Sequence, residues 1–284
     1  HPDVGIWFTR EENGRWLPAV EVANGIQPSA PRLPTWNPVL FQAPGGSLLL
    51  FYKIGPSPSK WWGMVITSSD GGRTWTEPRR LPDGILGPVK NKPVVLPDGR
   101  WLSASSTEGN EDGWRVHFET TSDRGASWQR IGPIAKGPGL DAIQPSILCH
   151  RDGSLQALCR TRQGVIAQTW SRDQGRTWSA LTAIDLPNPN SGTDAITLRD
   201  GRHLLVYNHS AHRAHEAKGN RYPLDLAISD DGLTWTRVLT LEREPRGSGY
   251  AYPAVIQTAD GKVHVTYTFD RKRIKHVVLV PPAR

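Results

Sequence analysis

Residues 68–75 read Ser-Ser-Asp-Gly-Gly-Arg-Thr-Trp, and the pattern Ser/Thr-x-Asp-x-Gly-x-x-Trp recurs three more times along the chain. The fourth copy, residues 228–235, keeps an aspartate as Asp230 but has Ile228 at the hydroxyl position. The tryptophans of the four copies lie 53, 50 and 57 residues apart. A repeat of this length predicts a fold built from similar units in series. The second and third copies are residues 121–128 and 171–178.

A second repeat, out of phase with the first, predicts the strands of each unit. Tight-turn dipeptides lie between short apolar runs, and Asp-Gly in this context is a strong hairpin signal because glycine accepts a positive φ. Each unit then has two strands joined by this turn, a variable loop, a third strand, the motif turn and an outer strand. The turn dipeptides are Gly45-Gly46, Asp98-Gly99, Asp152-Gly153, Asp200-Gly201 and Asp260-Gly261.

Four antiparallel strands in about fifty residues are typical of a propeller blade, so we predict an all-β, six-bladed β-propeller. Residues 1–284 form a single domain in this prediction, because the blades of a radial repeat pack on their neighbours. Trp16 marks a decayed first copy of the motif, and the inner strands of its blade would lie before residue 1. The first blade is therefore expected to be incomplete in this chain.

The composition agrees with this fold and argues against other classes of protein. The 284 residues include 28 Gly, 24 Pro and 12 Trp, and no stretch has the apolar period of a helix. No apolar run reaches transmembrane length and no signal peptide stands at the start, so we expect no membrane insertion. Cys149 and Cys159 are not directly opposite across their hairpin turn, and we expect both to be reduced and buried.

The charge balance points to an anionic partner. The net charge is +7, with 34 Lys and Arg against 27 Asp and Glu. Such a surplus favours nucleic acid, acidic sugars or a membrane surface. The chain has no basic run and no recognisable nucleic-acid module, so we expect an acidic glycan or oligosaccharide and no nucleic acid.

Strand direction predicts which end of the blades carries function. Both kinds of repeated turn lie at one end of the strands, where the motif carboxylates would cap backbone N–H groups and the indoles would fill gaps between blades. The longer polar loops lie at the other end, where binding residues are more common. The cations expected there are Lys53, Lys90, Lys92, Arg115, Arg160, Arg162, Arg221, Arg271 and Arg273.

The repeated motif is similar to the Asp-box, or BNR repeat, of sialidases, and the resemblance extends over essentially the whole chain. Sialidases bind the substrate carboxylate with three arginines and attack the sugar with a tyrosine that a glutamate polarises. The segment from Gln144-Pro145 to Arg160 resembles the blade that carries one of these arginines. Arg221, just before the third strand of a later blade, resembles another. Tyr252, eight residues before Asp260, resembles the family tyrosine.

Two departures from the family pattern affect the expected mechanism. The first arginine and the acid/base aspartate of the family belong to a segment that the resemblance places before residue 1. The position of the polarising glutamate is Gln144, and a neutral amide can orient a phenol but cannot accept its proton. Either another acid serves, with Glu108 and Asp194 as candidates, or the mechanism differs from that of sialidases.

We therefore expect an exo-acting glycoside hydrolase that cleaves a terminal acidic sugar, sialic acid or similar, without a cofactor. Arg160 and Arg221 would bind the carboxylate and Tyr252 would act at the reacting carbon. Lys92 or Arg271 would add positive charge. The other candidates for substrate binding are Gln144, Arg162 and Tyr250.

Other readings stay open. A uronate-directed glycosidase or polysaccharide lyase would use Tyr252 with a histidine from the loop that holds His209, His212 and His215. These histidines lack the cysteines or paired carboxylates of a metal site, so we expect no metal. A non-catalytic glycan-binding propeller would explain Gln144. The Trp61-Trp62 pair either forms a wall for a sugar or packs between blades.

Overall fold

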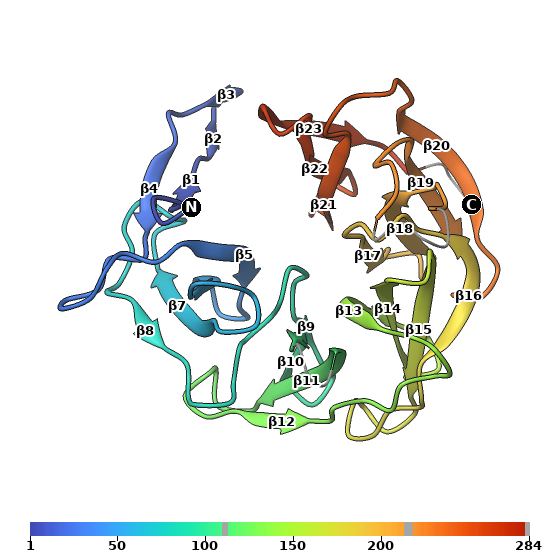
Figure 1. Cartoon of the computed structure of the whole chain (residues 1–284), viewed down its shortest axis with the longest axis horizontal. Helices are drawn as coiled ribbons and strands as arrows, with labels where there is room; N and C mark the ends of the chain where they lie inside the picture. The colour runs from blue at the N-terminus through green and yellow to red at the C-terminus, as the bar shows by residue number, and fades with distance from the viewer. Residues whose placement is uncertain (110–112, 213–217, 282–284) are drawn as a thin grey trace. The chain divides into compact units, whose positions relative to one another are not determined.

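The structure is a computed structural model that describes residues 1–109, 113–212 and 218–281 (Figure 1). It divides into two compact units, which we describe separately. Unit 1 comprises His1–Gly113 and His117–Arg130, and unit 2 comprises Trp114–Val116 and Ile131–Arg284. Within the described ranges the regular elements are β-strands, and no helix long and apolar enough to cross a membrane occurs.

The N-terminal part of the chain forms two small sheets, and two larger sheets follow. β1 (Ile6–Phe8) pairs with β4 (Val20–Ala23), and β2 (Glu11–Glu12) pairs with β3 (Arg15–Trp16). The two larger sheets have four strands each, in the orders β5-β6-β7-β8 and β9-β10-β11-β12. Their strands are β5 (Thr35–Gln42), β6 (Leu48–Ile54), β7 (Trp62–Ser68), β8 (Arg79–Arg80), β9 (Val94–Val95), β10 (Trp101–Glu108), β11 (Trp114–Thr121) and β12 (Gln129–Ile131).

Unit 2 contains three further sheets, each with its strands in chain order. Two have four strands, β13-β14-β15-β16 and β17-β18-β19-β20, and the third has three, β21-β22-β23. The strands are β13 (Ala142–Cys149), β14 (Leu155–Thr161), β15 (Val165–Ser171), β16 (Thr182–Pro187), β17 (Asp194–Thr197), β18 (His203–Asn208), β19 (Leu224–Ser229), β20 (Thr236–Glu242), β21 (Tyr250–Gln257), β22 (Val263–Phe269) and β23 (Arg273–Leu279).

The all-β prediction is confirmed, but the prediction of six blades is wrong. The described residues form five blade sheets, four with four strands and the last with three. The residues expected to make the outer half of a first blade form the β1-β4 pair and the β2-β3 hairpin instead. Trp16 is 54% exposed on β3, so its indole does not pack as a motif tryptophan would.

The motif turns have the scaffold role that was predicted. In the third copy, Asp173 Oδ1 accepts hydrogen bonds from Ser171 Oγ at 2.8 Å and from the Thr177 N–H at 2.9 Å. Trp178 Nε1 donates to the Gly175 carbonyl at 3.1 Å. Burial alone would raise the pKa of Asp173, but its hydrogen bonds outweigh burial and lower the pKa to about 2. The carboxylate therefore closes the turn and is not available for chemistry.

The fourth copy corrects the sequence register by one residue. Ser229 Oγ donates to Asp231 Oδ1 at 2.9 Å and accepts from the Gly232 N–H at 2.8 Å. Ser229 and Asp231 therefore take the places that the sequence pattern gave to Ile228 and Asp230. The reason is packing, because Ile228 contacts the apolar cluster of this blade and its neighbour.

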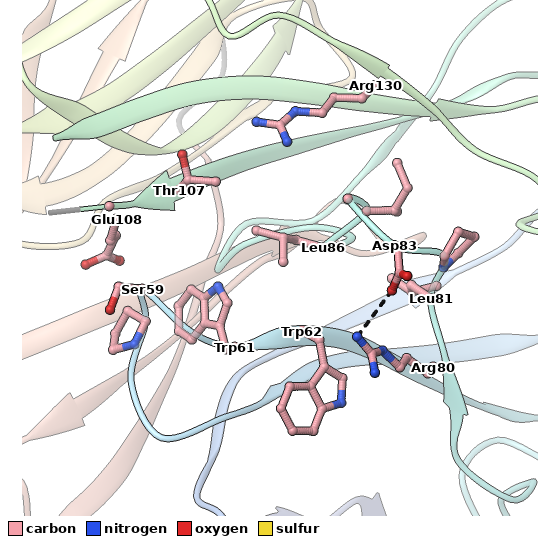
Figure 2. A pocket seen from close by; sticks show the side chains of 15 residues that line it. Ser59, Trp61, Trp62, Arg80, Leu81, Asp83, Leu86, Thr107, Glu108 and Arg130 are labelled. Carbon is pink, nitrogen blue, oxygen red and sulfur yellow. Dashed lines mark hydrogen bonds and ion pairs between the residues drawn. The ribbon is translucent and has the colours of Figure 1, made fainter. Parts of the chain in front are cut away.

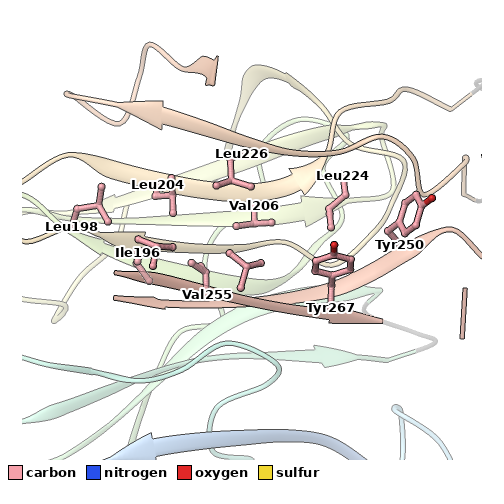
Figure 3. Packing of buried hydrophobic residues seen from close by; sticks show 11 residues of the cluster. Ile196, Leu198, Leu204, Val206, Leu224, Leu226, Tyr250, Val255 and Tyr267 are labelled. Atoms are coloured by element: carbon pink, nitrogen blue, oxygen red, sulfur yellow. The ribbon is translucent and has the colours of Figure 1, made fainter. Parts of the chain in front are cut away.

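Apolar side chains fill the space between neighbouring sheets of unit 2. Figure 3 shows Leu204, Val206 and Leu226 of the β17–β20 sheet facing Val255 and Tyr267 of the β21–β23 sheet. A second cluster joins the β13–β16 and β17–β20 sheets, and the motif indole of Trp235 packs against it. This confirms the prediction that motif tryptophans fill gaps between blades.

Two neutral histidines link the β13–β16 and β17–β20 sheets. His150 Nε2 lies 3.1 Å from Gln156 Oε1, which accepts because the amide nitrogen of Gln156 donates elsewhere. His150 Nδ1 therefore accepts from His203 Nε2, 3.2 Å away. His203 Nδ1 is then left to accept from the Thr197 hydroxyl at 3.0 Å. A proton added to His150 Nδ1 would place two N–H groups against each other, and a proton added to His203 Nδ1 would require the Thr197 hydroxyl to turn and accept instead of donate.

This pair predicts a loss of stability in mild acid. Burial lowers the pKa of His203 to about 4 and also lowers the pKa of His150, against the opposing charges of Asp152 and Asp231. The neutral rings therefore stabilise the fold fully above the ordinary histidine pKa of about 6.5, and this stabilisation is lost as the pH falls from there towards about 4. The melting temperature should fall between about pH 7 and about pH 5, above the range in which carboxylates titrate.

The matched variant is His203→Gln, which keeps a polar side chain but cannot be protonated. We expect this variant to be less stable at neutral pH and to show a flatter dependence of melting temperature on pH over the same interval. Equal slopes for the two proteins would show that the histidine pair does not cause the acid sensitivity.

Candidate functional site

Two inner strands of unit 2 carry a β-bulge near their first residues. On β13 the bulge falls at Gln144-Pro145, and on β21 it falls at Tyr252-Pro253. Gln144 has φ 56° and Tyr252 has φ 52°, in the left-handed region that such residues rarely adopt. Bulges re-aim side chains and are common next to functional sites, so these two positions mark the candidate site.

The bulge on β21 separates two tyrosines that regular alternation would place on one side. Tyr252 is 44% exposed, whereas Tyr250 is 1% exposed. The Tyr250 hydroxyl donates to the Glu244 carbonyl at 2.7 Å, and its ring packs on Phe269 with the centroids 5.2 Å apart. Tyr250 therefore packs inside the unit, and its predicted role in substrate binding gains no support from these contacts.

Arg160 reaches the site from the end of β14. Its side chain is buried, and its Cζ lies 5.2 Å from the ring centroid of Trp114. Arg162 stacks on the same indole at 4.4 Å. Cation–π contacts of this kind hold a guanidinium in a fixed orientation. A role for Trp114 was not predicted from the sequence. The feature that could have suggested one is its position at the start of the third strand of a blade, next to the variable loop.

Arg221 reaches the site from the loop before β19. Its Cζ lies 5.1 Å from the ring centroid of Tyr252, and its backbone carbonyl accepts the Tyr250 N–H at 2.8 Å. Gly249 makes this approach possible, because a Cβ there would lie 2.7 Å from both Arg221 Cβ and Arg221 O. With φ 63°, Gly249 also holds a backbone conformation that favours glycine. The glycine thus lets β21 begin directly against the arginine.

The two arginines change the chemistry of the Tyr252 phenol. Burial on its own would raise the pKa of Tyr252. The charges of Arg160 and Arg221, and the hydrogen bonds that both make to the phenol, outweigh burial and lower the pKa below its ordinary value. Three side chains that the sequence predicted for one site therefore come together in unit 2.

Gln144 and Asp194 are both buried in unit 2. The carboxylate of Asp194 accepts hydrogen bonds from backbone and hydroxyl groups. Asp194 Oδ2 accepts the Val255 N–H at 2.8 Å, and Oδ1 accepts the Ala195 N–H at 2.9 Å and the Ser146 hydroxyl at 3.3 Å. These bonds connect three inner strands. The carboxylate of Asp194 thus has a scaffold role, and its predicted role as a catalytic acid or base gains no support.

The remaining predicted cations and acids have other environments. Arg271 is exposed in the turn between β22 and β23, and Arg162 is an exposed residue that stacks on the Trp114 indole. Lys92 and Glu108 belong to unit 1, whereas Tyr252 belongs to unit 2. Lys53, another expected loop cation, is fully buried and donates to the Pro88 carbonyl at 2.9 Å.

Two of the three loop histidines contact other residues of unit 2. His209 Nδ1 lies 2.5 Å from the hydroxyl of the buried Tyr207, and His212 packs close to Gly164. His215 lies outside the described residues. Among the residues that the structure describes, no group of three His, Cys, Asp or Glu side chains is arranged to hold a metal ion.

Comparisons with known proteins agree with this fold. A model of the BNR repeat-like domain family matches residues 1–265. No curated protein matches the chain. Among solved structures, a Hadza microbial sialidase superposes with a TM-score of 0.77 at 18% identity, covering 95% of this chain and 58% of the sialidase.

Two other solved structures are similar. A Dyadobacter fermentans protein of unknown function has a TM-score of 0.74 at 19% identity, with 95% of this chain and 80% of that protein covered. A Trypanosoma rangeli sialidase in complex with an inhibitor has a TM-score of 0.66 at 14% identity, with 90% of this chain and 46% of the sialidase covered. At these identities the likeness shows the β-propeller fold alone. The chain spans about half the length of the two sialidases.

Proposed function

Because the chain belongs to the family of BNR repeat-like domains, we propose that it is an exo-acting glycoside hydrolase that removes a terminal acidic sugar from a glycan. Sialic acid or a similar sugar is the proposed substrate. The observation that carries this proposal is the convergence of the Arg160 and Arg221 guanidiniums on the Tyr252 phenol. The sialidases among the structural neighbours support the choice of sugar class.

In this proposal the arginines bind the carboxylate of the sugar. Guanidinium groups present parallel N–H donors that match the two oxygens of a carboxylate, and such bonds are strong when they are removed from water. Trp114 keeps the Arg160 group oriented before substrate arrives. In sialic acid the carboxylate is bonded directly to the anomeric carbon, so a carboxylate held there brings this carbon close to the Tyr252 hydroxyl.

Tyr252 is the proposed nucleophile. Its oxygen forms a bond to the anomeric carbon while the bond from that carbon to the leaving oxygen breaks, and water then releases the sugar from the tyrosine. A phenol attacks well only when its proton is removed or its pKa is lowered. Gln144 cannot accept that proton. In this proposal the positive charges of Arg160 and Arg221 favour the phenolate instead, because they lower the pKa of Tyr252.

A non-catalytic glycan-binding protein is the second candidate, because Gln144 is a neutral, buried amide where a base would be needed. The lyase alternative requires a histidine beside the reacting tyrosine. Among the described loop histidines, His209 instead bonds to the buried Tyr207, and this arrangement does not favour a lyase at Tyr252.

The proposal is tested by incubating the protein with aryl glycosides of sialic acid and of glucuronic acid. Release of the aryl alcohol from the sialoside, with the free sugar as the second product, is the expected result. Faster release from the glucuronide would shift the assignment to a uronate-directed enzyme, and new ultraviolet absorbance from an unsaturated sugar would indicate a lyase. Saturable binding of the sialoside without turnover would support the binding protein.

A further inference from the structure

Unit 1 holds a cavity of about 260 Å³ between the β5–β8 and β9–β12 sheets (Figure 2). Its lining comes from the loop before β7, the segment between β8 and β9, the end of β10 and the side chain of Arg130. In Figure 2, Ser59, Trp61 and Glu108 lie at one end of the cavity, and Arg80 and Asp83 lie at the other. A cavity of this size is below the usual range for drug-sized ligands of about 300–1,000 Å³ and suits a single small ring.

The aromatic wall of the cavity is held in place on several sides. The guanidinium of Arg80 lies over the Trp62 ring, with its Cζ 5.2 Å from the centroid, and Arg80 Nη2 bonds to Asp83 Oδ1 at 3.2 Å. Trp61 is buried and packs edge-on against Trp36, with the centroids 6.1 Å apart. The two indoles are therefore fixed before any ligand arrives, which lowers the entropy cost of binding.

The rest of the lining alternates apolar and polar groups. Leu81 and Ile85 are buried and form an apolar surface, while Ser59 and Thr107 offer hydroxyls. The charged lining residues are two cations and two anions, so the cavity has no net preference for a charged ligand. They are Arg80, Arg130, Asp83 and Glu108.

We propose that this cavity binds a neutral pyranose unit of a glycan. A pyranose ring has an apolar C–H face that packs on an indole, and it has hydroxyls around its edge that meet hydroxyl and carboxylate groups. The balanced charge of the lining distinguishes this site chemically from the cationic surroundings of Tyr252 in unit 2. The proposal does not depend on hydrolysis, because binding is measured without turnover.

The test is titration calorimetry of the whole chain with methyl galactoside, methyl glucoside and methyl glucuronide. An Arg160→Leu, Arg221→Leu double variant, which lacks the acidic-sugar site proposed for unit 2, should bind at least one neutral glycoside more tightly than the glucuronide. Trp62→Ala should weaken that binding by about tenfold, in line with the loss of a ring contact and its fixed geometry. The matched control is Trp7→Ala, because Trp7 is 63% exposed in the same unit, and this variant should bind as wild type does.

A second variant keeps the proposal testable if Trp62→Ala does not fold. Thr107→Val keeps the side-chain shape and removes one hydroxyl from the lining, and we expect it to weaken binding several-fold with an unchanged melting temperature. No binding of either neutral glycoside to wild type, tighter binding of the glucuronide by the double variant, or equal losses in the Trp62 and Trp7 variants would overturn the proposal. Unchanged binding in both Trp62→Ala and Thr107→Val would overturn it as well.

Discussion

Tyr252→Phe should lower turnover of an acidic aryl glycoside by about 10³-fold or more, as expected when a group that acts on the reacting atoms is removed. The substitution removes one hydroxyl and keeps the ring on which the Arg221 guanidinium lies. Both arginines therefore stay available for the sugar carboxylate. The dissociation constant of the substrate should change by no more than about threefold, so the loss falls on kcat. Steady-state kinetics together with calorimetric binding separate these two effects.

The control for this experiment is Tyr250→Phe. Tyr250 is buried two residues away, and its hydroxyl bonds to the Glu244 carbonyl. Loss of that hydrogen bond should lower stability by about 1 kcal/mol and leave turnover unchanged. Wild-type turnover by Tyr252→Phe would show that the Tyr252 hydroxyl takes no part in catalysis. An equal loss of turnover in both variants would indicate a fold defect.

Arg160→Leu should weaken binding of an acidic glycoside by about 100-fold, because a charge-assisted hydrogen bond to a carboxylate contributes about 1.5–3 kcal/mol. The same change should affect the pH dependence of turnover. Arg160 is the leading cause that lowers the pKa of Tyr252, so its loss raises that pKa again. Since the phenolate is the reactive form, the rising limb of the pH–rate profile should move to higher pH.

Arg176→Leu is the matched control, because Arg176 is an exposed arginine on a motif turn at the other end of the strands. It should leave both the binding constant and the pH–rate profile unchanged. A binding loss in Arg160→Leu that is equal for neutral and acidic glycosides would contradict recognition of the carboxylate.

Much of the fold follows from short-range sequence signals. The Asp-Gly dipeptides predicted the hairpins, and the Asp98-Gly99 turn does lie between β9 and β10. These signals work because a hairpin turn and a motif turn are each closed by bonds among a few neighbouring residues. The number of blades was harder to predict, because a decayed copy such as the one at Trp16 keeps the pattern without its packing.

The site was predicted in part, and the errors share one cause. Position in the repeat predicted that Arg160, Arg221 and Tyr252 lie close together, and their side chains do meet in unit 2. It could not show which face a side chain takes once a bulge adds a residue, and the different exposure of Tyr250 and Tyr252 was not predicted for that reason. Lys53 was misassigned in a related way. On β6, Lys53 pairs with the residue next to the β5 bulge, just as Arg160 on β14 pairs with the residue next to the β13 bulge. Unlike Arg160, however, Lys53 donates its hydrogen bond to the Pro88 carbonyl inside unit 1.

Contacts between residues far apart in the chain could not be predicted from local sequence patterns. The stacking of Arg160 and Arg162 on Trp114 brings the end of β14 and the turn after it against the first residue of β11 in another sheet. The position of Trp114 at a strand end does not by itself mark this contact. The scaffold role of Asp194 likewise depends on its bond to the Val255 N–H of a neighbouring sheet.

The central claim is that the Arg160 and Arg221 guanidiniums at Tyr252 recognise the carboxylate of an acidic sugar. The most direct measurement is calorimetric binding of a sialoside to Tyr252→Phe, compared with the matching sugar in which a carboxamide replaces the carboxylate. The account predicts that the carboxylate binds about 100-fold more tightly and that this preference is lost in an Arg160→Leu, Arg221→Leu double variant. Equal affinity for the two sugars would contradict it.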